Sequence, residues 1–289
     1  MKIIDCIQQG KPFYSLEFFP PKDKGAWPDF FTSVDRLRAI NPLFCSVTYG
    51  AGGNAAAGTM EIASRLTGLG LTTMTHLTCV RAEPDSIRAY LLQLEKAGVA
   101  NILALRGDPP ADREMRWEDC HFTYASDLVA FVRREFPDFG IGVAAYLTPH
   151  PESASFAEDR QHTAMKIKSG SDFAVTQLFF DSREYFEYVE QMRKLGITQP
   201  ILPGVLPVQS LEVLRHVLGL SGCNIPAKLY LALEAADRKG GAEAVKEAGT
   251  AHAVEQIRRL LAGGAPGVHL YTMNKADLCL RIAERVGPL

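Results

Sequence analysis

Eight short apolar segments alternate with helical patterns along the chain, and this alternation constrains the fold more than any other feature. The segments are rich in β-branched and aromatic residues, as buried strands are. They lie at residues 13–19, 43–49, 72–78, 100–106, 141–147, 173–180, 201–206 and 267–273. Helical patterns follow at residues 26–39, 57–68, 84–97, 124–135, 155–168, 182–195, 209–219 and 275–286. Strand–helix units in this unbroken order predict an α/β fold, a (β/α)8 TIM barrel.

Helix-start signals support three of these boundaries. Pro84 and Asp85 open one helical pattern, and Asp181 precedes another. Ser126 and Asp127 fall in the first turn of a third. Proline and short polar residues favour these positions because the first N–H groups of a helix have no partner within it.

A doubly wound sheet is the alternative fold, and it would carry a glycine fingerprint after an early strand. The stretch "YGAGGNAAAG", Tyr49 to Gly58, matches neither that fingerprint nor a P-loop. It is interpreted as a flexible loop leading into a helix, with close approach of the backbone to a ligand as the other interpretation. Residues 209–266 are too many for one helix, so they predict an insertion between strands seven and eight of a single domain, 1–289.

Charge and cysteine usage exclude several classes of protein. The 31 basic and 33 acidic residues are well mixed, with a formal net charge of −2, and no basic stripe indicates a nucleic acid partner. The N-terminal apolar run is too short for a signal peptide, and no segment reaches the ~20 apolar residues of a membrane span. Six scattered cysteines without a CxxC pair are typical of reduced thiols in a cytoplasmic protein. His76 and Cys79 lack the second pair of a zinc site, so no metal is expected.

Polar side chains end most of the predicted strands. In a barrel enzyme the C-terminal ends of the strands form the active site, so these residues predict a ligand-binding mouth. They are Glu17, Thr48, Tyr49, His76, Thr78, Arg106, Gly107, Asp108, Tyr146, His150, Gln177 and Tyr271.

Residue types that are missing from the predicted strands exclude two kinds of barrel enzyme. No predicted strand contains the lysine of a Schiff-base aldolase, and the first strand has no histidine of the kind that binds metal in hydrolase barrels. Two carboxylates, Glu17 and Asp108, remain among aromatic and amide side chains. They suit acid–base work on a bound cofactor or heterocycle. The residues alone take the prediction no further.

The ordered motifs resemble those of the methylenetetrahydrofolate reductases. They are "LEFFPP", "SVTYGAGG", "HLTC", "ILALRGDPP", "YASDLV", "VAAY", "HPE", "TQLFFD", "PGVLPV" and "LYTMNKAD", and together they run from about residue 13 to 287. The resemblance implies a (β/α)8 barrel that binds FAD at the strand C-termini. It also implies reduction of 5,10-methylenetetrahydrofolate to 5-methyltetrahydrofolate with electrons from NAD(P)H by a ping-pong route, as part of one-carbon metabolism and methionine biosynthesis.

The resemblance assigns roles to particular residues. Glu17 matches the general acid that protonates N10 of the folate, Asp108 matches a carboxylate beside flavin and pterin, and Gln177 matches a folate-binding amide. Positions that match flavin contacts are Thr48, His76, Arg106, Gly107, Asp108, Tyr124, Ala125, Tyr146, His150, Asp159, Lys166 and Tyr271. Arg106 and Lys166 can offset the charge of the diphosphate.

Four positions depart from the family pattern. Leu211 replaces the aromatic residue that stacks on nicotinamide or folate, and it is expected to form an apolar lid on the substrate. His162 and Met165 replace an asparagine and an arginine that help to hold FAD, so weaker flavin retention is expected. Lys275 replaces an arginine and is expected to meet a folate carboxylate.

Two interpretations of the function remain open beside the NAD(P)H-dependent reductase. The same core could take its electrons from a partner protein, or the barrel could bind folate or flavin without catalysis. A homo-oligomer is expected. Burial of Glu17 is expected to raise its pKa toward working pH, as a general acid requires. The structural alternative is an internal ion pair of Glu17, for example with Arg106.

Overall fold

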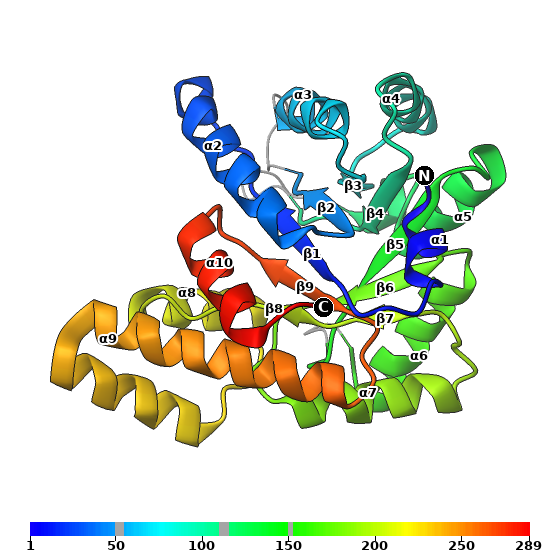
Figure 1. The fold of residues 1–289 in the computed structure, drawn as a ribbon. Coiled ribbons are helices and arrows are strands. Elements are labelled where there is room, and N and C mark those ends of the chain that lie inside the picture. Colours follow the sequence, from blue (N-terminus) through cyan, green and yellow to red (C-terminus); the bar gives the residue numbers. More distant parts are fainter. Residues whose placement is uncertain (50–54, 110–115, 150–152) are drawn as a thin grey trace.

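A computed structural model describes residues 1–49, 55–109, 116–149 and 153–289, and in it a parallel sheet rolls up inside a layer of helices (Figure 1). The glycine-rich stretch and His150 therefore lie wholly or partly outside the described residues. The strands are β1 (Tyr14–Phe18), β2 (Phe44–Val47), β3 (Thr73–Thr78), β4 (Asn101–Leu105), β5 (Gly140–Ala145), β6 (Phe173–Thr176), β7 (Ile201–Leu202), β8 (Gly204–Val205) and β9 (Val268–Tyr271).

Helices follow β1 to β6, β8 and β9, as the alternation predicts, and one further helix, α1, precedes β1. They are α1 (Ile3–Ile7), α2 (Trp27–Leu37), α3 (Ala55–Gly68), α4 (Pro84–Lys96), α5 (Ala125–Glu135), α6 (Phe156–Lys168), α7 (Ser182–Lys194), α8 (Leu211–Ser221), α9 (Ala227–Ala262) and α10 (Ala276–Val286). The expected helix starts are confirmed: α4 begins at Pro84, and the Asp181 side chain accepts a hydrogen bond from the amide of Arg183 at the start of α7.

The barrel closes through a strand that proline divides. The order of the strands is β7-β6-β5-β4-β3-β2-β1-β9-β8, and every neighbouring pair is parallel. Only Pro203 separates β7 from β8. Proline has no N–H to donate, so the predicted strand 201–206 breaks there. Its first half pairs with β6 and its second half with β9. The two halves together act as the seventh barrel strand, which confirms the barrel and makes the doubly wound alternative wrong.

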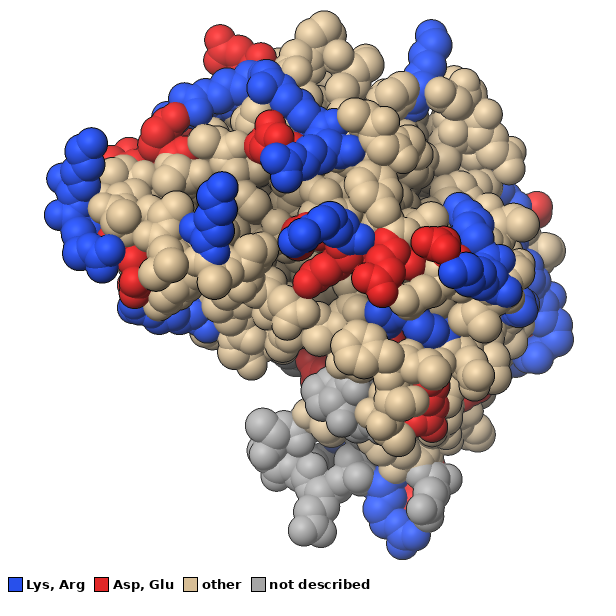
Figure 2. Space-filling model, turned by 90° about the horizontal axis from the view of Figure 1, so that it is seen from below, with Lys and Arg blue, Asp and Glu red and all other residues tan. Residues whose placement is uncertain are grey.

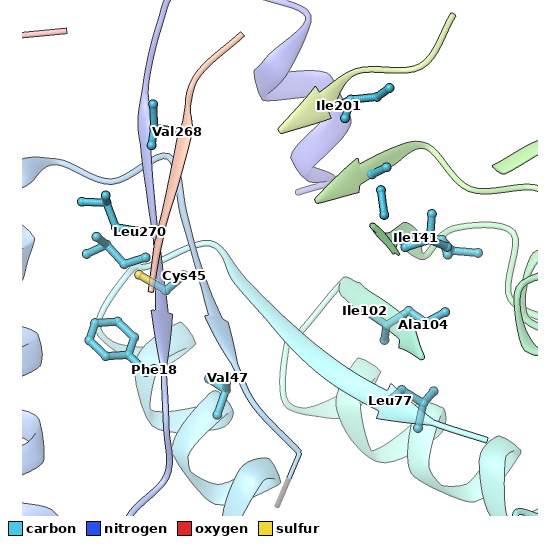
Figure 3. Close-up of a cluster of buried hydrophobic side chains, with 14 of the residues drawn as sticks. Phe18, Cys45, Val47, Leu77, Ile102, Ala104, Ile141, Ile201, Val268 and Leu270 are labelled. Carbon is cyan, nitrogen blue, oxygen red and sulfur yellow. The ribbon is translucent and has the colours of Figure 1, made fainter. Parts of the chain in front are cut away.

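Side chains on the two faces of the strands separate into two apolar layers. Outward-facing residues such as Phe18, Val47 and Leu270 pack beneath the helices (Figure 3). Inward-facing residues near the N-terminal ends of the strands fill the barrel interior as a second cluster, which includes Phe44 and Phe173. The interior is therefore closed by packing at one end, and its polar residues gather at the other.

A short helix that the sequence did not predict closes the apolar end of the barrel. Ile3 and Ile7 of α1 pack into the interior cluster. The Asn101 side chain, at the start of β4, accepts a hydrogen bond from the amide of Ile3 at 2.9 Å and donates one to the carbonyl of Met1 at 3.0 Å. This end of the barrel is structural, as is usual for the face opposite the active site.

The long segment before β9 forms a helical hairpin. Gly240 and Gly241 leave helical geometry, with φ of 61° at Gly241, and the chain turns back on itself inside α9 (Figure 1). The second arm, residues 242–262, packs against α10 and α7 in the outer layer, whereas α8 packs mainly against α9. The second arm thus takes the place of the seventh barrel helix. The inserted segment consists of α8 and the first arm of α9, residues 227–239.

Candidate active site

Glu17 lies at the centre of the polar end of the barrel. It is on β1, 5% exposed. Its Oε2 atom lies 3.2 Å from Nε2 of His76, 3.4 Å from Nε2 of His269 and 3.4 Å from Oγ of Ser46. Among the described residues, these contacts of the Glu17 side chain all fall on Oε2. The carboxylate is therefore held at one oxygen by residues from β2, β3 and β9.

Two imidazoles reverse the expected shift of the Glu17 pKa. Burial alone would raise it, but the positive charge of His76 and the hydrogen bond from His269 lower it to about 2. The expectation of a raised pKa is wrong in this geometry because it considered burial without these partners. The structural alternative named Arg106 as an example of a partner for Glu17, and its carboxylate instead contacts His76, His269 and Ser46.

Residues after β9 fix the backbone of β1 beside the carboxylate. The Thr272 hydroxyl donates a hydrogen bond to the Glu17 carbonyl at 2.6 Å. The Asn274 side chain accepts a hydrogen bond from the amide of Phe19 at 3.1 Å and donates one to its carbonyl at 2.6 Å. Asn274 holds a left-handed backbone with φ of 57°, which asparagine tolerates better than most residues. This clamp sets the direction of the end of β1.

The segment after β4 brings a cation, a tight backbone passage and a carboxylate to the rim. The Arg106 guanidinium lies 4.5 Å from the ring centroid of Trp117. Gly107 has φ of 83°, and a Cβ atom there would lie 2.7 Å from Cγ1 of Val80. Only glycine lets the chain pass so close. The side chain of Asp108 is exposed beside this passage.

The helix α5 begins at the same rim. Tyr124, just before the helix, is 58% exposed, and Ala125 is buried as its first residue. The amides of Thr123 and Tyr124 donate hydrogen bonds to the Asp127 carboxylate at 3.0 and 2.9 Å. An exposed aromatic ring therefore stands above a fixed helix terminus.

The helix α6 adds a buried carboxylate and a partly buried amine. Asp159 is 5% exposed and accepts hydrogen bonds from the Ser153 hydroxyl and from Arg160, both at 3.1 Å. Burial lowers the pKa of Lys166 to about 8, against the opposing charge of Asp159. His162, one turn from both, is exposed. Burial, followed by the charge of Asp108, raises the pKa of Tyr146 at the end of β5.

Comparison with known proteins identifies the family. The family model for methylenetetrahydrofolate reductase matches residues 2–287. The chain belongs to the methylenetetrahydrofolate reductase family. A 5,10-methylenetetrahydrofolate reductase of Escherichia coli is 34% identical over 281 residues, which cover 96% of this chain and 92% of that protein. The similarity thus extends over the barrel as a whole.

Longer relatives match over only part of their length. Methylenetetrahydrofolate reductase (NADH) 1 of Arabidopsis thaliana is 37% identical over 304 residues, 99% of this chain and 51% of that protein. The chain therefore spans about half the length of this reductase. A solved structure of an uncharacterized Clostridium thermocellum protein, which binds two copies of 5-methyl-5,6,7,8-tetrahydrofolic acid, has a TM-score of 0.63 at 13% identity and covers 98% of this chain and 99% of that one. Such a likeness shows the fold alone.

Gln177 and Tyr271 lie where β6 and β9 end. Tyr271, on β9, donates a hydrogen bond to the Thr176 carbonyl at 2.8 Å. Gln177 directly follows β6, and its side chain accepts a hydrogen bond from the amide of Leu178 at 2.9 Å. Burial, followed by the charge of Glu17, raises the pKa of Tyr271 well above its ordinary value. Both residues thus lie at the same end of the barrel as Glu17.

The second arm of α9 supports the loop that follows Gln177. The Gln256 side chain donates a hydrogen bond to the Phe179 carbonyl at 2.8 Å. Nε2 of His252 lies 3.1 Å from the Phe180 carbonyl. One face of a helix far along the chain therefore holds the polar backbone of this loop.

Three further predicted positions make no side-chain hydrogen bond or ion pair to the Glu17 carboxylate within the described residues. Leu211 is 9% exposed at the start of α8, within an apolar cluster that also holds Leu233 of α9. Lys275 is exposed just before α10. Thr48 is half-buried after β2, and its carbonyl accepts a hydrogen bond from the Thr59 hydroxyl at 3.0 Å. His150 lies outside the described residues.

Sequence reasoning missed several residues that lie around Glu17 or support the loops at the polar end of the barrel. Ser15, Ser46 and His269 alternate with their apolar neighbours along the strands, and this period could have placed them inside the barrel with Glu17. Arg160 had no such signal. It is 7% exposed and donates hydrogen bonds to the carbonyls of Tyr146 and Leu147 at 3.2 and 2.6 Å. It therefore braces the loop after β5 from below.

Among the described residues, features for metal binding and for membrane spanning are both absent. Within the described residues, no group of three or more His, Cys, Asp and Glu side chains could hold a metal ion. In that same part of the chain, no helix is long and apolar enough to span a bilayer. Basic and acidic side chains are interspersed on the face seen in Figure 2.

Proposed function

We propose that the protein reduces 5,10-methylenetetrahydrofolate to 5-methyltetrahydrofolate, with FAD as cofactor and NAD(P)H as electron source, in a ping-pong reaction. The observation that carries this proposal is Glu17, a buried carboxylate anchored at one oxygen at the polar end of the barrel, in a chain that belongs to the reductase family along its whole length.

The residues after β4 and on α6 fit a flavin dinucleotide. Gly107 lets the chain pass tightly over Val80 and Thr78, and this passage sets Arg106 and Asp108 at the rim. Arg106 and Lys166 supply the cations that a diphosphate needs. The exposed Tyr124 ring offers a stacking surface, and Asp159 can accept hydrogen bonds from hydroxyl groups. FAD, when bound, supplies the site that accepts hydride from nicotinamide and donates it to the folate.

Glu17 supplies the proton of the folate half-reaction. Protonation of N10 opens the five-membered ring of the substrate, and the methylene carbon then becomes an electrophilic iminium carbon. The Glu17 pKa of about 2 describes a site without a heterocycle over it. A bound pterin excludes water and raises that pKa, since burial favours the neutral acid.

Other residues bind and orient the substrates. The Gln177 amide pairs with the pterin edge, and Lys275 meets a carboxylate of the folate tail. Asp108, exposed at the rim, influences both half-reactions through its charge. Leu211 lies in the apolar cluster of α8 and α9, where it shapes the wall of this region rather than stacking on a ring.

A spectrum and two assays test the proposal. The purified protein, with FAD added if needed, should show a flavin spectrum that bleaches with NADH or NADPH and recovers with methylenetetrahydrofolate under anaerobic conditions. Slow bleaching by both nicotinamides, with rapid recovery after chemical reduction, would point to electrons from a partner protein. A reduced flavin that methylenetetrahydrofolate fails to reoxidise would refute the reductase function and leave a binding protein.

A further inference from the structure

His269 is a buried histidine to which the reaction outlined above assigns no role. It lies on β9, is 0% exposed, and its ring stacks on Phe44 with centroids 5.7 Å apart and planes at 18°. Its Nδ1 atom lies 2.8 Å from Oγ of Ser15. Its Nε2 atom lies 3.4 Å from Oε2 of Glu17 and 3.4 Å from Oγ of Ser46. The ring is therefore fixed in a position where one nitrogen faces the carboxylate.

Hydrogen-bond accounting favours a proton on the nitrogen that faces Glu17. The Ser15 hydroxyl lies 3.4 Å from the Val268 carbonyl, to which it can donate, and Ser15 Oγ then accepts from Nδ1–H of His269. With a second proton on Nε2, both ring nitrogens donate, one to Ser15 and one to the Glu17 carboxylate. The neutral alternative keeps the proton on Nε2, and its Nδ1 accepts from the Ser15 hydroxyl at 2.8 Å. In both arrangements a proton on Nε2 faces Oε2 of Glu17, 3.4 Å away.

Few other charged groups face this pair. From β3, His76 contacts the same Oε2 atom at 3.2 Å. On β9 itself, the Tyr271 ring lies 5.6 Å from His269, and its hydroxyl is engaged by the Thr176 carbonyl. On β2, Phe44 and Ser46 are not titratable near neutral pH, and the Cys45 thiol packs in the outer apolar cluster; β8, Gly204–Val205, has no titratable side chain. One carboxylate and two imidazoles therefore meet at a single oxygen, Oε2 of Glu17.

We propose that His269 is a positioning residue that stores the proton that Glu17 delivers to the folate. Before the folate binds, the ring carries this proton and Glu17 is a carboxylate. When the folate covers the site, the proton passes from Nε2 of His269 to Oε2 of Glu17, and the resulting acid protonates N10. The ring is then neutral and Glu17 ionised, and the pair regains one proton from solvent after the product leaves. This inference rests on the proposed function.

The pH dependence of the folate half-reaction tests the storage role. His269→Gln keeps a hydrogen-bonding group and removes the titratable ring. Flavin reoxidation by methylenetetrahydrofolate should slow by about 30-fold or more at pH 8.5 and by less than about fivefold at pH 6, since only at high pH must a stored proton be kept. Flavin reduction by the nicotinamide should not change. His216→Gln, at an exposed position of α8, is the matched control.

An equal loss at every pH, or an equal loss in both half-reactions, would overturn the proposal and leave His269 a packing residue. Ser15→Ala gives a second variant if His269→Gln does not fold. It frees the ring at Nδ1 and should shift the pH profile in the same direction by a smaller amount. A Ser15→Ala profile identical to wild type would also count against the proposal.

A measurement without folate separates this inference from the proposed function. The Cε1–H signal of His269 can be followed by NMR as the pH changes, in wild type and in Glu17→Gln. If the two groups share a proton, loss of the carboxylate should lower the midpoint of the ring's titration by at least about one pH unit. An unchanged midpoint would refute proton sharing even in a protein that reduces folate. A shifted midpoint in a protein that does not act on folate would refute the reductase function alone.

Discussion

Replacing Glu17 with glutamine should separate the two half-reactions. The amide keeps the shape of the side chain and cannot donate the proton that N10 needs. Flavin reduction by NAD(P)H should be nearly unchanged, because that step takes no proton from Glu17. Reoxidation by methylenetetrahydrofolate should slow by about 10²–10⁴-fold, the usual contribution of a general acid. This factor corresponds to about 3–5 kcal/mol of activation free energy.

The same substitution has a stability cost that the structure sets. The Glu17 pKa falls from an ordinary 4.5 to about 2 in the folded protein, and this difference is worth at most about 3 kcal/mol. A depressed pKa stabilises the fold above pH 4.5, and the contribution is lost as the pH falls through 4.5 toward 2. Glu17→Gln should therefore be less stable than wild type at neutral pH, and the gap should close toward pH 2.

Anaerobic stopped-flow and denaturant unfolding measure the two effects. Glu190→Gln is the control, since Glu190 is exposed on α7 and forms a salt bridge with Lys194 at 2.7 Å, an interaction worth little. Loss of flavin or of the fold in Glu17→Gln would mean that the carboxylate is structural. An equal slowing of both half-reactions would mean that another group donates the proton and that Glu17 tunes the flavin.

Three further variants test the surroundings of the site. Burial lowers the pKa of Lys166 to about 8, so the affinity of the protein for FAD should weaken as the pH rises through about 8. Fluorescence titration should show that Lys166→Met binds FAD about tenfold more weakly at pH 7 and lacks this pH dependence. A variant whose FAD affinity changes with pH as wild type does would refute a role of Lys166 in binding the diphosphate. Gly249→Ala would place a Cβ 2.1 Å from the carbonyl oxygen of Val208, so the free energy of unfolding should fall by about 1–3 kcal/mol. In the control Gly219→Ala, the new Cβ meets no neighbouring atom within 4 Å outside its own helix backbone, and stability should be unchanged or higher. Equal melting temperatures for the two variants would contradict the predicted clash at Gly249. Asn274→Gly permits the left-handed backbone but removes the clamp on β1, and it should slow reoxidation about tenfold; an unchanged rate would show that the clamp does not position the acid.

The periodic features of the fold could be read from the sequence. The strand β1 and the helix α4 lie where apolar alternation and Pro84 predict them. The divided seventh strand could not be read in the same way, because 201–206 is uniformly apolar and only the position of Pro203 between two partners decides the break. The helical hairpin was visible as excess length, but which arm joins the outer layer depends on packing against α7 and α10.

The sequence predicts candidate residues for the site more readily than it predicts the interactions among them. Glu17 follows from an acid inside an apolar strand. The direction of its pKa shift does not, because His269 approaches from a strand that is adjacent only once the barrel closes. Leu211 shows the reverse case. A role as a lid follows from its place in a motif, whereas its burial follows from α9, which a motif does not describe.

The long-range clamp on Glu17 has a consequence for biosynthesis. Glu17 leaves the ribosome early, but the residues that hold it, His269, Thr272 and Asn274, come 252–255 positions after their partners on β1. Domains are synthesised from the N-terminus, so a nascent chain has Glu17 with Ser46 and His76 long before it has the residues that complete its surroundings. Unfinished or truncated molecules therefore have no competent acid, and the onset of folate chemistry would report that translation has passed the last strand.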